Sequence, residues 1–406
     1  MIRSRMLLAA ALSALLLPIL PASATAEPRR KAETWATPGS TAITVTGHGY
    51  GHGHGLSQYG ALGAAEQGLS WRQIVDFYYP GTTWGRIGGK VRVLITADTG
   101  RDVQVVAQRG IKVGSVARKR TWRLPAVPAK KWRLIARGDD TLVQHTRGGA
   151  WRTWKKVPGE AEFSSTTGRL TLVLPGERRE YRGTLQSVAP RQGKRQTVNE
   201  VGMEAYLRGV VPQEVPALWT QAAVSAQSVA ARTYAAFERS HPSAAHYDLC
   251  DTTQCQVYGG VDAEHPAATA AIKATAGQGL MYDGRPAFTQ FSASNGGWSS
   301  AGSMPYLVAQ ADPYDGVTGH QYSTWTETID DVQVERHWPA IGDLTSIEVT
   351  SRDGNGDWGG RVTDMAFIGT TGTARVDGDT VRSYFGLNSD WFTFSVTPRQ
   401  QGPARQ

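Results

Sequence analysis

The sequence is poor in cysteine and, beyond its first 20 residues, in long apolar runs. Only two cysteines occur among 406 residues. After Leu20 no apolar stretch approaches the length that a helix needs to cross a bilayer. The chain also lacks internal repeats and long low-complexity tracts. These shortages argue against stable insertion into a membrane and against a repeat architecture.

The single long apolar run, residues 6–20, stands at the beginning of the chain. Arg3 and Arg5 precede it, and the small-x-small sequence ATA follows at 24–26. This arrangement is typical of a secretory signal peptide. We therefore expect residues 1–26 to be removed and the mature protein to be secreted to the extracytoplasmic side, at the cell wall. No cysteine follows the run, so a lipid anchor has no support.

The chain is basic, with a formal net charge of +8, and loss of Arg3 and Arg5 leaves +6. A secreted basic protein suits an anionic partner such as a cell wall or a membrane surface. Export makes nucleic acid an unsuitable partner. The 40% hydrophobic content and 46 glycines fit a folded, loop-rich protein of one large or two medium domains.

The two cysteines, Cys250 and Cys255, lie close together in YDLCDTTQCQVYGG. In an exported protein such a pair is most simply a disulfide that closes a small loop. The alternative is a structural zinc site formed with His246 and a further ligand.

The pattern of apolar residues predicts an α+β protein. Residues 85–185 contain strand-like runs such as VRVLIT, WRLIAR and LTLVLP, separated by turn residues. Residues 217–240 are rich in alanine, free of Gly and Pro, and periodic at three and four, which predicts a central helix. The β-rich part also carries many Lys and Arg residues between its tryptophans. These form either an ordinary solvated face or a face that binds glycan or wall.

Glu214 is the first candidate for chemistry. It lies in GVVPQEVPALW, just before the predicted central helix and among apolar residues. A helix N-terminus favours the charged carboxylate, whereas an apolar pocket raises its pKa. A general acid needs the second effect to prevail. The alternative interpretation is a helix-capping glutamate without chemistry.

The stretch GHGYGHGHGLSQYGALGAA begins at Gly47 and holds three histidines, His48, His52 and His54. They could ligate a metal, but no Asp, Glu or Cys lies within the loop to complete the ligand shell. The glycines alone are a weak phosphate signal, since no Gly-Lys-Ser/Thr follows. The third interpretation is a glycine-hinged loop that lines a cleft. A second loop, FSASNGGWSS at 291–300, offers hydroxyl and amide groups to a polar ligand, or is an ordinary turn.

Four stretches together resemble the SpoIID/LytB domain family: residues 198–235, 247–260, 291–315 and 51–84. The resemblance covers most of the mature chain. In members of that family the GHGxGxSQYGA element usually comes last, whereas here it comes first. This order looks like a circular permutation, which folds tolerate when their ends lie close together. It predicts that residues 47–84 dock beside 198–315 as one wall of a cleft, and that the loop glycines allow a glycan to approach closely.

The resemblance implies a lytic transglycosylase that cleaves the glycan strands of peptidoglycan, with a preference for strands stripped of stem peptides. It places the catalytic acid/base at Glu214, and the substrate's own C6 hydroxyl would be the nucleophile, so no cofactor is required. The products would carry 1,6-anhydro-N-acetylmuramic ends. Some relatives hold zinc near the cysteine stretch. The alternative is a non-catalytic wall-binding amidase enhancer that recruits a cell-wall amidase, and a more distant one is a metal-dependent hydrolase built on the three histidines.

The candidate substrate-binding residues come from the loops and from the central helix. Arg232 is also a candidate to brace a carboxylate, either Glu214 or Asp251, and each helix residue has simple packing as its alternative. The full candidate set is His52, His54, Ser57, Gln58, Tyr59, Gln227, Arg232, Tyr234, Gln256, Tyr258, Ser292, Ser294, Asn295 and Gly296.

The expected organisation is a signal peptide, a flexible arm at 27–40 and one SpoIID/LytB-like domain at 41–400. Within that domain we expect a permuted cleft element, a β-rich subdomain, a catalytic core and a C-terminal α/β part, at 47–84, 85–185, 186–320 and 321–400.

Overall fold

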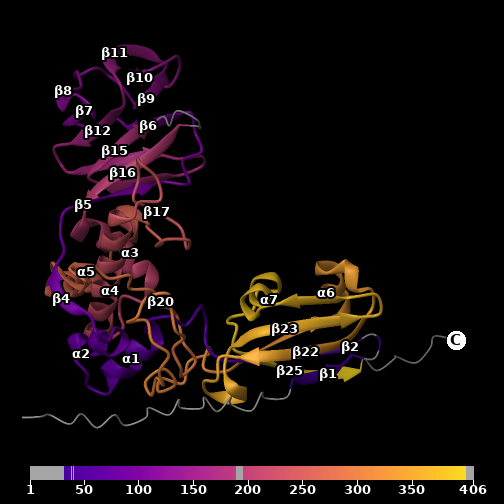
Figure 1. Cartoon of the computed structure of the whole chain (residues 1–406). Helices are drawn as coiled ribbons and strands as arrows, with labels where there is room; N and C mark the ends of the chain where they lie inside the picture. Colours follow the sequence, from indigo (N-terminus) through magenta and orange to yellow (C-terminus); the bar gives the residue numbers. More distant parts are fainter. Residues whose placement is uncertain (1–31, 38, 40, 189–194, 399–406) are drawn as a thin grey trace, which may run out of the picture.

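The computed structural model describes residues 32–37, 39, 41–188 and 195–398. It confirms the α+β class, with seven α-helices and several mainly antiparallel sheets in these residues. In Figure 1 a β-rich region, a helical region and the helices α1 (Gln58–Glu66) and α2 (Trp71–Tyr78) follow one another along a column. A C-terminal sheet region extends to one side. The predicted signal peptide lies outside the described residues.

Two large sheets build the β-rich region. The seven-stranded sheet has the order β17 (Leu249–Cys250), β5 (Lys90–Leu94), β16 (Gln196–Gly202), β15 (Thr184–Val188), β12 (Ala161–Ser165), β7 (Ile111–Ser115) and β8 (Arg120–Arg123). The six-stranded sheet has the order β11 (Arg152–Pro158), β10 (Asp140–Thr146), β9 (Lys131–Arg137), β6 (Asp102–Val106), β13 (Arg169–Val173) and β14 (Arg178–Arg182). Alternate residues such as Trp132 and Leu134 of β9 are buried, as period-2 strands require, and the two sheets share one core.

Helix α4 (Gln221–Ser240) is the centre of the helical region. Ala226 and Ala230 belong to a core that α1 and α2 share, whereas Ala231 and Ala235 belong to the core of the β-rich region. Small side chains all round the helix allow neighbours to pack on both sides. The other helical elements here are α3 (Met203–Glu214), α5 (Pro266–Ala274) and the 3₁₀-helix η1 (Gly260–Ala263).

The central helix begins four residues later than the sequence predicts. Val215 precedes a proline and is extended, at φ −136° and ψ 148°, as such residues prefer. Thr220 is still extended at ψ 139°, so helical geometry begins at Gln221. A separate helix, α3, precedes this break.

Small sheets connect the N-terminal segment to the helical region. A three-stranded sheet has the order β19 (Arg285–Pro286), β18 (Gln278–Tyr282) and β4 (Thr83–Arg86). A parallel pair joins β20 (Phe291–Ser292) to β3 (Leu56–Ser57). Residues 47–84 therefore lie beside 198–315, the arrangement that a permuted order predicts.

The C-terminal region takes strands from both ends of the chain. Its four-stranded sheet has the order β1 (Glu33–Ala36), β22 (Leu344–Arg352), β23 (Val362–Gly369) and β24 (Thr373–Val376). Its three-stranded sheet has the order β21 (Trp325–Asp330), β2 (Thr41–Gly47) and β25 (Phe392–Pro398). The remaining elements are α6 (Asp331–His337), α7 (Gly378–Phe385), η2 (Pro339–Ile341) and η3 (Asp357–Gly359).

One prediction about the N-terminal arm is wrong. Residues 33–36 form β1 and pair with β22, because Trp35 packs against the C-terminal core and Glu33 accepts hydrogen bonds from Arg352. The next strand, β2, pairs with β25 at the other end of the chain. The two ends of the described chain are therefore neighbours in one sheet, as a permuted order requires.

No helix in the described residues is long and apolar enough to cross a membrane.

Candidate active site

The His-Gly loop is held against the 290–300 segment by its backbone. Tyr50 and Ser294 exchange backbone hydrogen bonds of 2.8 and 3.1 Å, and the Ser300 N–H donates to the Gly53 carbonyl at 2.9 Å. Leu56 and Ser57 then pair with β20. These contacts bring the loop from the start of the chain to the helical region.

The loop glycines serve this docking. Gly51, Gly53 and Gly55 have φ of +106°, +73° and +64°. A Cβ on Gly55 would lie 2.2 Å from the Gln290 carbonyl oxygen, and one on Gly51 would lie 2.7 Å from the Ser292 Cβ. The partners that approach so closely are the protein's own residues.

A pocket of about 460 Å³ opens where the loop, the helices and the disulfide-closed loop meet. It contains five of the predicted site residues, namely Glu214, His52, Gln58, Tyr234 and Ser292, together with Cys255. The rest of the lining is Tyr50, Gly51, Thr253, Gln254, Val257, Gln290, Phe291, Ala293 and Arg382.

Glu214 is the acid of this pocket. Burial raises the pKa of Glu214 to about 7, although hydrogen bonds from the Val257 N–H and the Gln58 side chain lower it in part. Glu214 is the last residue of α3, so its carboxyl group lies at the negative end of that helix and not at the N-terminus of α4. Gln58 comes from the N-terminal loop, and its contact with Glu214 joins residues 156 positions apart.

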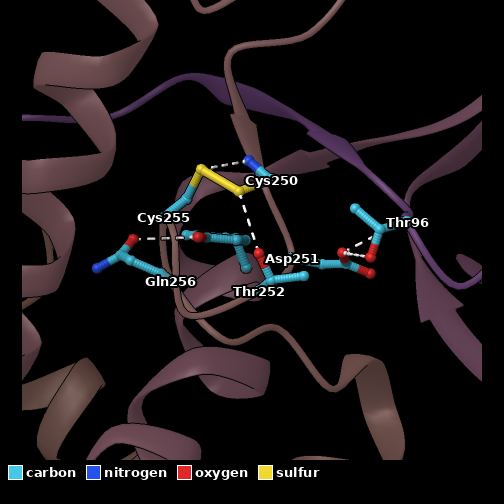
Figure 2. Close-up of a disulfide and its surroundings, with 7 residues drawn as sticks. Thr96, Cys250, Asp251, Thr252, Cys255 and Gln256 are labelled. Carbon is cyan, nitrogen blue, oxygen red and sulfur yellow. Dashed lines mark hydrogen bonds between the residues drawn. A yellow bond between two sulfur atoms is a disulfide. The ribbon is translucent and has the colours of Figure 1, made fainter. Parts of the chain in front are cut away.

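The disulfide between Cys250 and Cys255 forms the neighbouring wall. Figure 2 shows it closing the loop, with Asp251 directed to Thr96. The Asp251 carboxylate accepts hydrogen bonds from the Thr96 N–H and hydroxyl, at 3.1 and 2.6 Å. The loop is thus fixed at both ends, and it presents the Val257 N–H to Glu214.

His52 is a neutral group in the same pocket. Burial, followed by the charges of His54, Arg361 and Arg382, lowers the pKa of His52 to about 3. Its Nδ1 accepts the His54 N–H at 3.0 Å, so the ring proton is on Nε2, which is a donor. His54 stacks on His52 at 4.8 Å and is bonded through Nδ1 to the Ser300 carbonyl, so it supports the lining without being part of it.

Two buried aspartates that sequence reasoning missed organise the residues beneath the pocket. Asp315 accepts hydrogen bonds from the Ser57 hydroxyl, from the Ser294 hydroxyl at 2.7 Å and from the Gly296 N–H at 3.0 Å. Burial alone would raise the pKa of Asp315, but hydrogen bonds from His320, Ser57 and Ser294 outweigh it and lower the pKa.

Asp312 accepts hydrogen bonds from Asn295 Nδ2 at 2.7 Å and from the Tyr78 hydroxyl at 2.8 Å. Four predicted substrate ligands, Ser57, Ser294, Asn295 and Gly296, therefore have internal partners. Their polar groups fold the site and do not line the pocket.

Aromatic side chains lie beside the pocket. Tyr59 stacks on His320 at 4.0 Å and contacts Trp219 at 5.0 Å and Tyr322 at 5.7 Å. Tyr322 in turn packs on the lining residue Tyr50 at 4.7 Å. Tyr50 is 42% exposed, so this group provides aromatic surface of the kind that sugar rings stack on.

Arg232 lies away from the pocket and contradicts the prediction that it braces Glu214 or Asp251. It is fully buried and binds Glu204 at the start of α3, with Nε and Nη2 at 2.9 and 2.8 Å from the two oxygens.

Three further candidates are also core residues. The Gln256 amide accepts from the Tyr206 hydroxyl at 3.0 Å, and the Tyr258 hydroxyl donates to Asn199 at 2.9 Å. Gln227 is 1% exposed, and its amide has no hydrogen-bond partner among the described residues.

The geometry does not assemble either of the alternative metal sites, the one at the cysteines or the one at the three histidines. The two cysteine sulfurs form a disulfide, and His246 Nε2 is hydrogen-bonded to the Gln196 side-chain oxygen instead. His48 stacks on Trp358 at 4.7 Å, apart from the His52–His54 pair. In the part of the chain that the structure describes, no three His, Cys, Asp or Glu residues are grouped to hold a metal ion.

Some lining residues had a signal in the sequence and others had none. Thr253, Gln254 and Val257 lie within or next to the disulfide loop, so their neighbourhood was marked. Arg382 comes from α7 in the C-terminal region, and nothing in the local sequence connects it with Glu214.

The sequence matches a known family in the segment that holds Glu214. The family described as "SpoIID: Stage II sporulation protein" matches residues 191–282. The chain therefore carries a SpoIID-family domain.

Curated relatives agree with this assignment. Over 135 residues the chain is 36% identical to the amidase enhancer of Bacillus subtilis, covering 32% of this chain and 17% of the relative. It is 32% identical over 156 residues to an uncharacterized protein of Brachyspira hyodysenteriae, covering 37% and 42%. It is 27% identical over 237 residues to stage II sporulation protein D of Bacillus subtilis, covering 51% and 66%. The chain thus spans less than two thirds of each relative, and its disulfide and its domain are consistent with an extracytoplasmic location.

Proposed function

We propose that the protein is a secreted lytic transglycosylase that cleaves peptidoglycan glycan strands. The observation that carries this proposal is the state of Glu214, which lies in the pocket. Burial raises the pKa of its carboxyl group to about 7. Such a group is part protonated and part ionised near neutral pH, so it can donate a proton and take one back. The reaction needs both steps from one carboxyl group.

The first step is proton donation from Glu214 to the glycosidic oxygen, which leaves with the departing sugar. The C6 hydroxyl oxygen of the N-acetylmuramic residue then bonds to C1, and its proton returns to Glu214. The glycosidic bond is replaced by a 1,6-anhydro bond, no water is added, and the acid is regenerated. The side-chain amide of Gln58 and the Val257 N–H keep the carboxyl group oriented through both transfers.

Neighbouring groups suit a sugar ligand. Neutral His52 offers an Nε2–H donor, and Ser292 contributes to the same lining. Tyr50 supplies an aromatic face at the same pocket. A few polar groups around an apolar surface are a common arrangement in ligand sites.

Arg382 fits the proposed preference for strands stripped of stem peptides. Removal of the peptide leaves a free lactyl carboxylate on each N-acetylmuramic residue, and a guanidinium binds carboxylates well. In the structure Arg382 binds Asp379 at 2.7 Å, three residues earlier on the surface of α7. Exposed pairs of this kind are weak, so a substrate carboxylate can replace Asp379.

Product analysis tests the proposal. Mature wild-type protein and Glu214→Gln would be incubated with peptide-stripped strands and with intact sacculi, and soluble fragments read by mass spectrometry. We expect anhydro-ended fragments from the wild type and a rate at least about 1,000-fold lower for the variant. Fragments that have gained a water would show hydrolysis instead.

The second candidate function is a wall-binding amidase enhancer without catalysis of its own. The relative named amidase enhancer, 36% identical over the matched 135 residues, favours it. Binding of glycan without fragments from either substrate, together with faster cleavage by an added wall amidase, would select this alternative.

A further inference from the structure

The positive charge of the chain is concentrated in one segment. Residues 101–156 contain fifteen Lys and Arg residues and only three Asp and no Glu, a net charge of +12. The whole chain carries +8, so the other 350 residues together carry −4. The basic character of the protein is therefore a property of this segment.

These cations lie at the end of the molecule opposite to α1 and α2. Figure 1 places β8, β10 and β11 there, far along the column from the helices. We call the exposed Lys and Arg side chains of this segment the basic surface. Its members are Arg101, Arg109, Arg118, Lys119, Arg120, Arg123, Lys130, Arg137, Arg147, Arg152 and Lys156.

Carboxylates within the segment neutralise little of this charge. Asp102 binds Arg133 at 2.9 Å, and Asp140 binds Lys156 at 2.7 Å. The third acid, Asp139, is exposed. An excess of a dozen cations over one end of a protein creates a field that attracts polyanions.

Tryptophans lie under several of the cations. The Lys155 ammonium is 5.0 Å from the Trp122 ring centre and 5.6 Å from that of Trp154, which connects the edges of the two large sheets. The Arg133 guanidinium lies 4.2 Å above Trp151. These contacts hold cations in place, which lowers the entropy lost when an anion binds.

The same end carries a hollow of about 580 Å³. His145, Arg147 and Arg152 contribute to its lining, together with Val127 and Pro128. The hollow lies around the β10–β11 turn, next to the exposed cations. An extended anionic chain could therefore contact the exposed cations and also enter the hollow.

We propose that the basic surface binds a phosphate-bearing polymer of the cell wall, a poly(polyol phosphate) chain, and so holds the protein on the wall. Nine of the fifteen cations are arginines, whose planar fork matches phosphate oxygens. Charge spread over two sheet edges and several loops fits a repeating polyanion better than a single small anion.

A lipid bilayer fits less well than a polymer. Insertion into a bilayer surface uses exposed apolar side chains. The exposed large apolar residues of this segment are Val116 and Val127, at 37% and 36% exposure, and its tryptophans are partly or fully buried.

A charge-matched pair of variants tests this proposal. The first replaces Arg118, Arg123 and Lys130 of the basic surface with Gln. The second makes the same change at exposed cations elsewhere, Lys273, Arg336 and Arg375. Binding of the mature proteins to purified poly(glycerol phosphate) would be measured by calorimetry at about 50 and about 200 mM salt, where charge-driven binding weakens steeply.

We expect salt-dependent binding by the wild type and the control, and an affinity at least about tenfold lower for the first variant. Equal binding by both variants would overturn the proposal. So would tighter binding to phosphatidylglycerol vesicles or to duplex DNA than to the polymer. Cleavage of short soluble glycans is measured on the same proteins: if the wild type cuts none, the proposed catalytic function fails while the binding comparison keeps its meaning.

Discussion

The pocket around Glu214 and the basic surface place their ionisable groups in opposite surroundings. In the pocket, burial raises the pKa of Glu214 to about 7 and lowers that of His52 to about 3. Both groups are driven towards their neutral forms, as desolvation requires. On the basic surface the cations remain in water, and many of them act together.

This difference predicts how each region responds to change. Effects of buried groups, in the pocket and in the helical core beside it, should be local, large for single residues and little affected by salt, because buried groups are poorly screened. Effects on the basic surface should be small for a single residue, additive and strongly dependent on salt. The following changes sharpen that comparison, beginning with the largest expected effect.

Arg232 of α4, which is fully buried and binds the partly exposed Glu204 of α3, should show the largest effect of a single substitution. Arg232→Met removes the cation that binds Glu204 and that also donates to the Gln278 carbonyl at 3.1 Å. We expect a loss of about 3 kcal/mol of stability, because the Gln278 and Ile272 carbonyls each lose a buried donor at about 1–3 kcal/mol. Glu204 contributes less, since its side chain is 35% exposed and water can solvate it. Urea denaturation measures it. Arg123→Gln, on the basic surface, is the matched control and should change stability by at most about 0.5 kcal/mol; losses of similar size in the two variants would remove the distinction.

The pH dependence of stability isolates Glu214. Its pKa is about 7 in the folded state against an ordinary value of 4.5, so between these values the native state binds more protons than the unfolded state. Stability from this group is therefore complete below about pH 4.5 and falls as pH rises towards 7, by at most about 3 kcal/mol.

The Glu214→Gln variant should lack the pH-dependent part of the stability that Glu214 contributes. The difference in unfolding free energy between wild type and variant, followed from pH 4 to pH 8, provides the measurement, and other titrating groups cancel in it. A difference that stays constant with pH would mean that Glu214 is ionised normally and is no general acid near neutrality.

The sequence could predict what depends on local patterns. The β-rich part, the alanine-rich helix and the cysteine pair each have a signature within a few residues. Helix α3 was not predicted, because Gly209 and Pro212 interrupt its pattern, and tertiary packing overrides them. That omission also placed Glu214 at the wrong helix end.

Only part of the candidate site could be predicted, because a sequence shows local patterns but not tertiary contacts. Glu214, Gln58 and the docking of the His-Gly loop followed from the resemblance and the permuted order. The polar loop residues Ser57, Ser294 and Asn295 looked like ligands because sequence shows their chemistry but not their partners. Their partners, Asp312 and Asp315, lie 17 to 258 residues away in the chain, and Arg382 reaches the pocket from α7, so no local pattern reveals these contacts.

The disulfide should matter to the pocket and not to the basic surface. Replacing Cys250 and Cys255 with Ser opens a loop of about six residues, for which chain entropy predicts a loss of about 2 kcal/mol. The hydrogen bond from the Val257 N–H, next to this loop, lowers the pKa of Glu214. Loss of that bond should raise this pKa, so the pH above which catalysis declines should also rise. Urea denaturation and a pH–rate profile measure the two effects, and binding to poly(glycerol phosphate) should be unchanged. A reductant should not alter the double variant further.

The smallest effect distinguishes Arg382, which lines the pocket, from the cations of the basic surface. Arg382→Gln should raise KM for stripped strands by about tenfold while kcat changes little, because it binds the lactyl carboxylate and not the reacting bond. Strands in which that carboxylate is converted to an amide should be cleaved equally by variant and wild type. The basic-surface variant should show the reverse pattern: unchanged kinetics on short soluble strands and slower release of fragments from intact walls. If Arg382→Gln lowered cleavage of both kinds of strand alike, Arg382 would support the fold of the pocket and would not select the substrate.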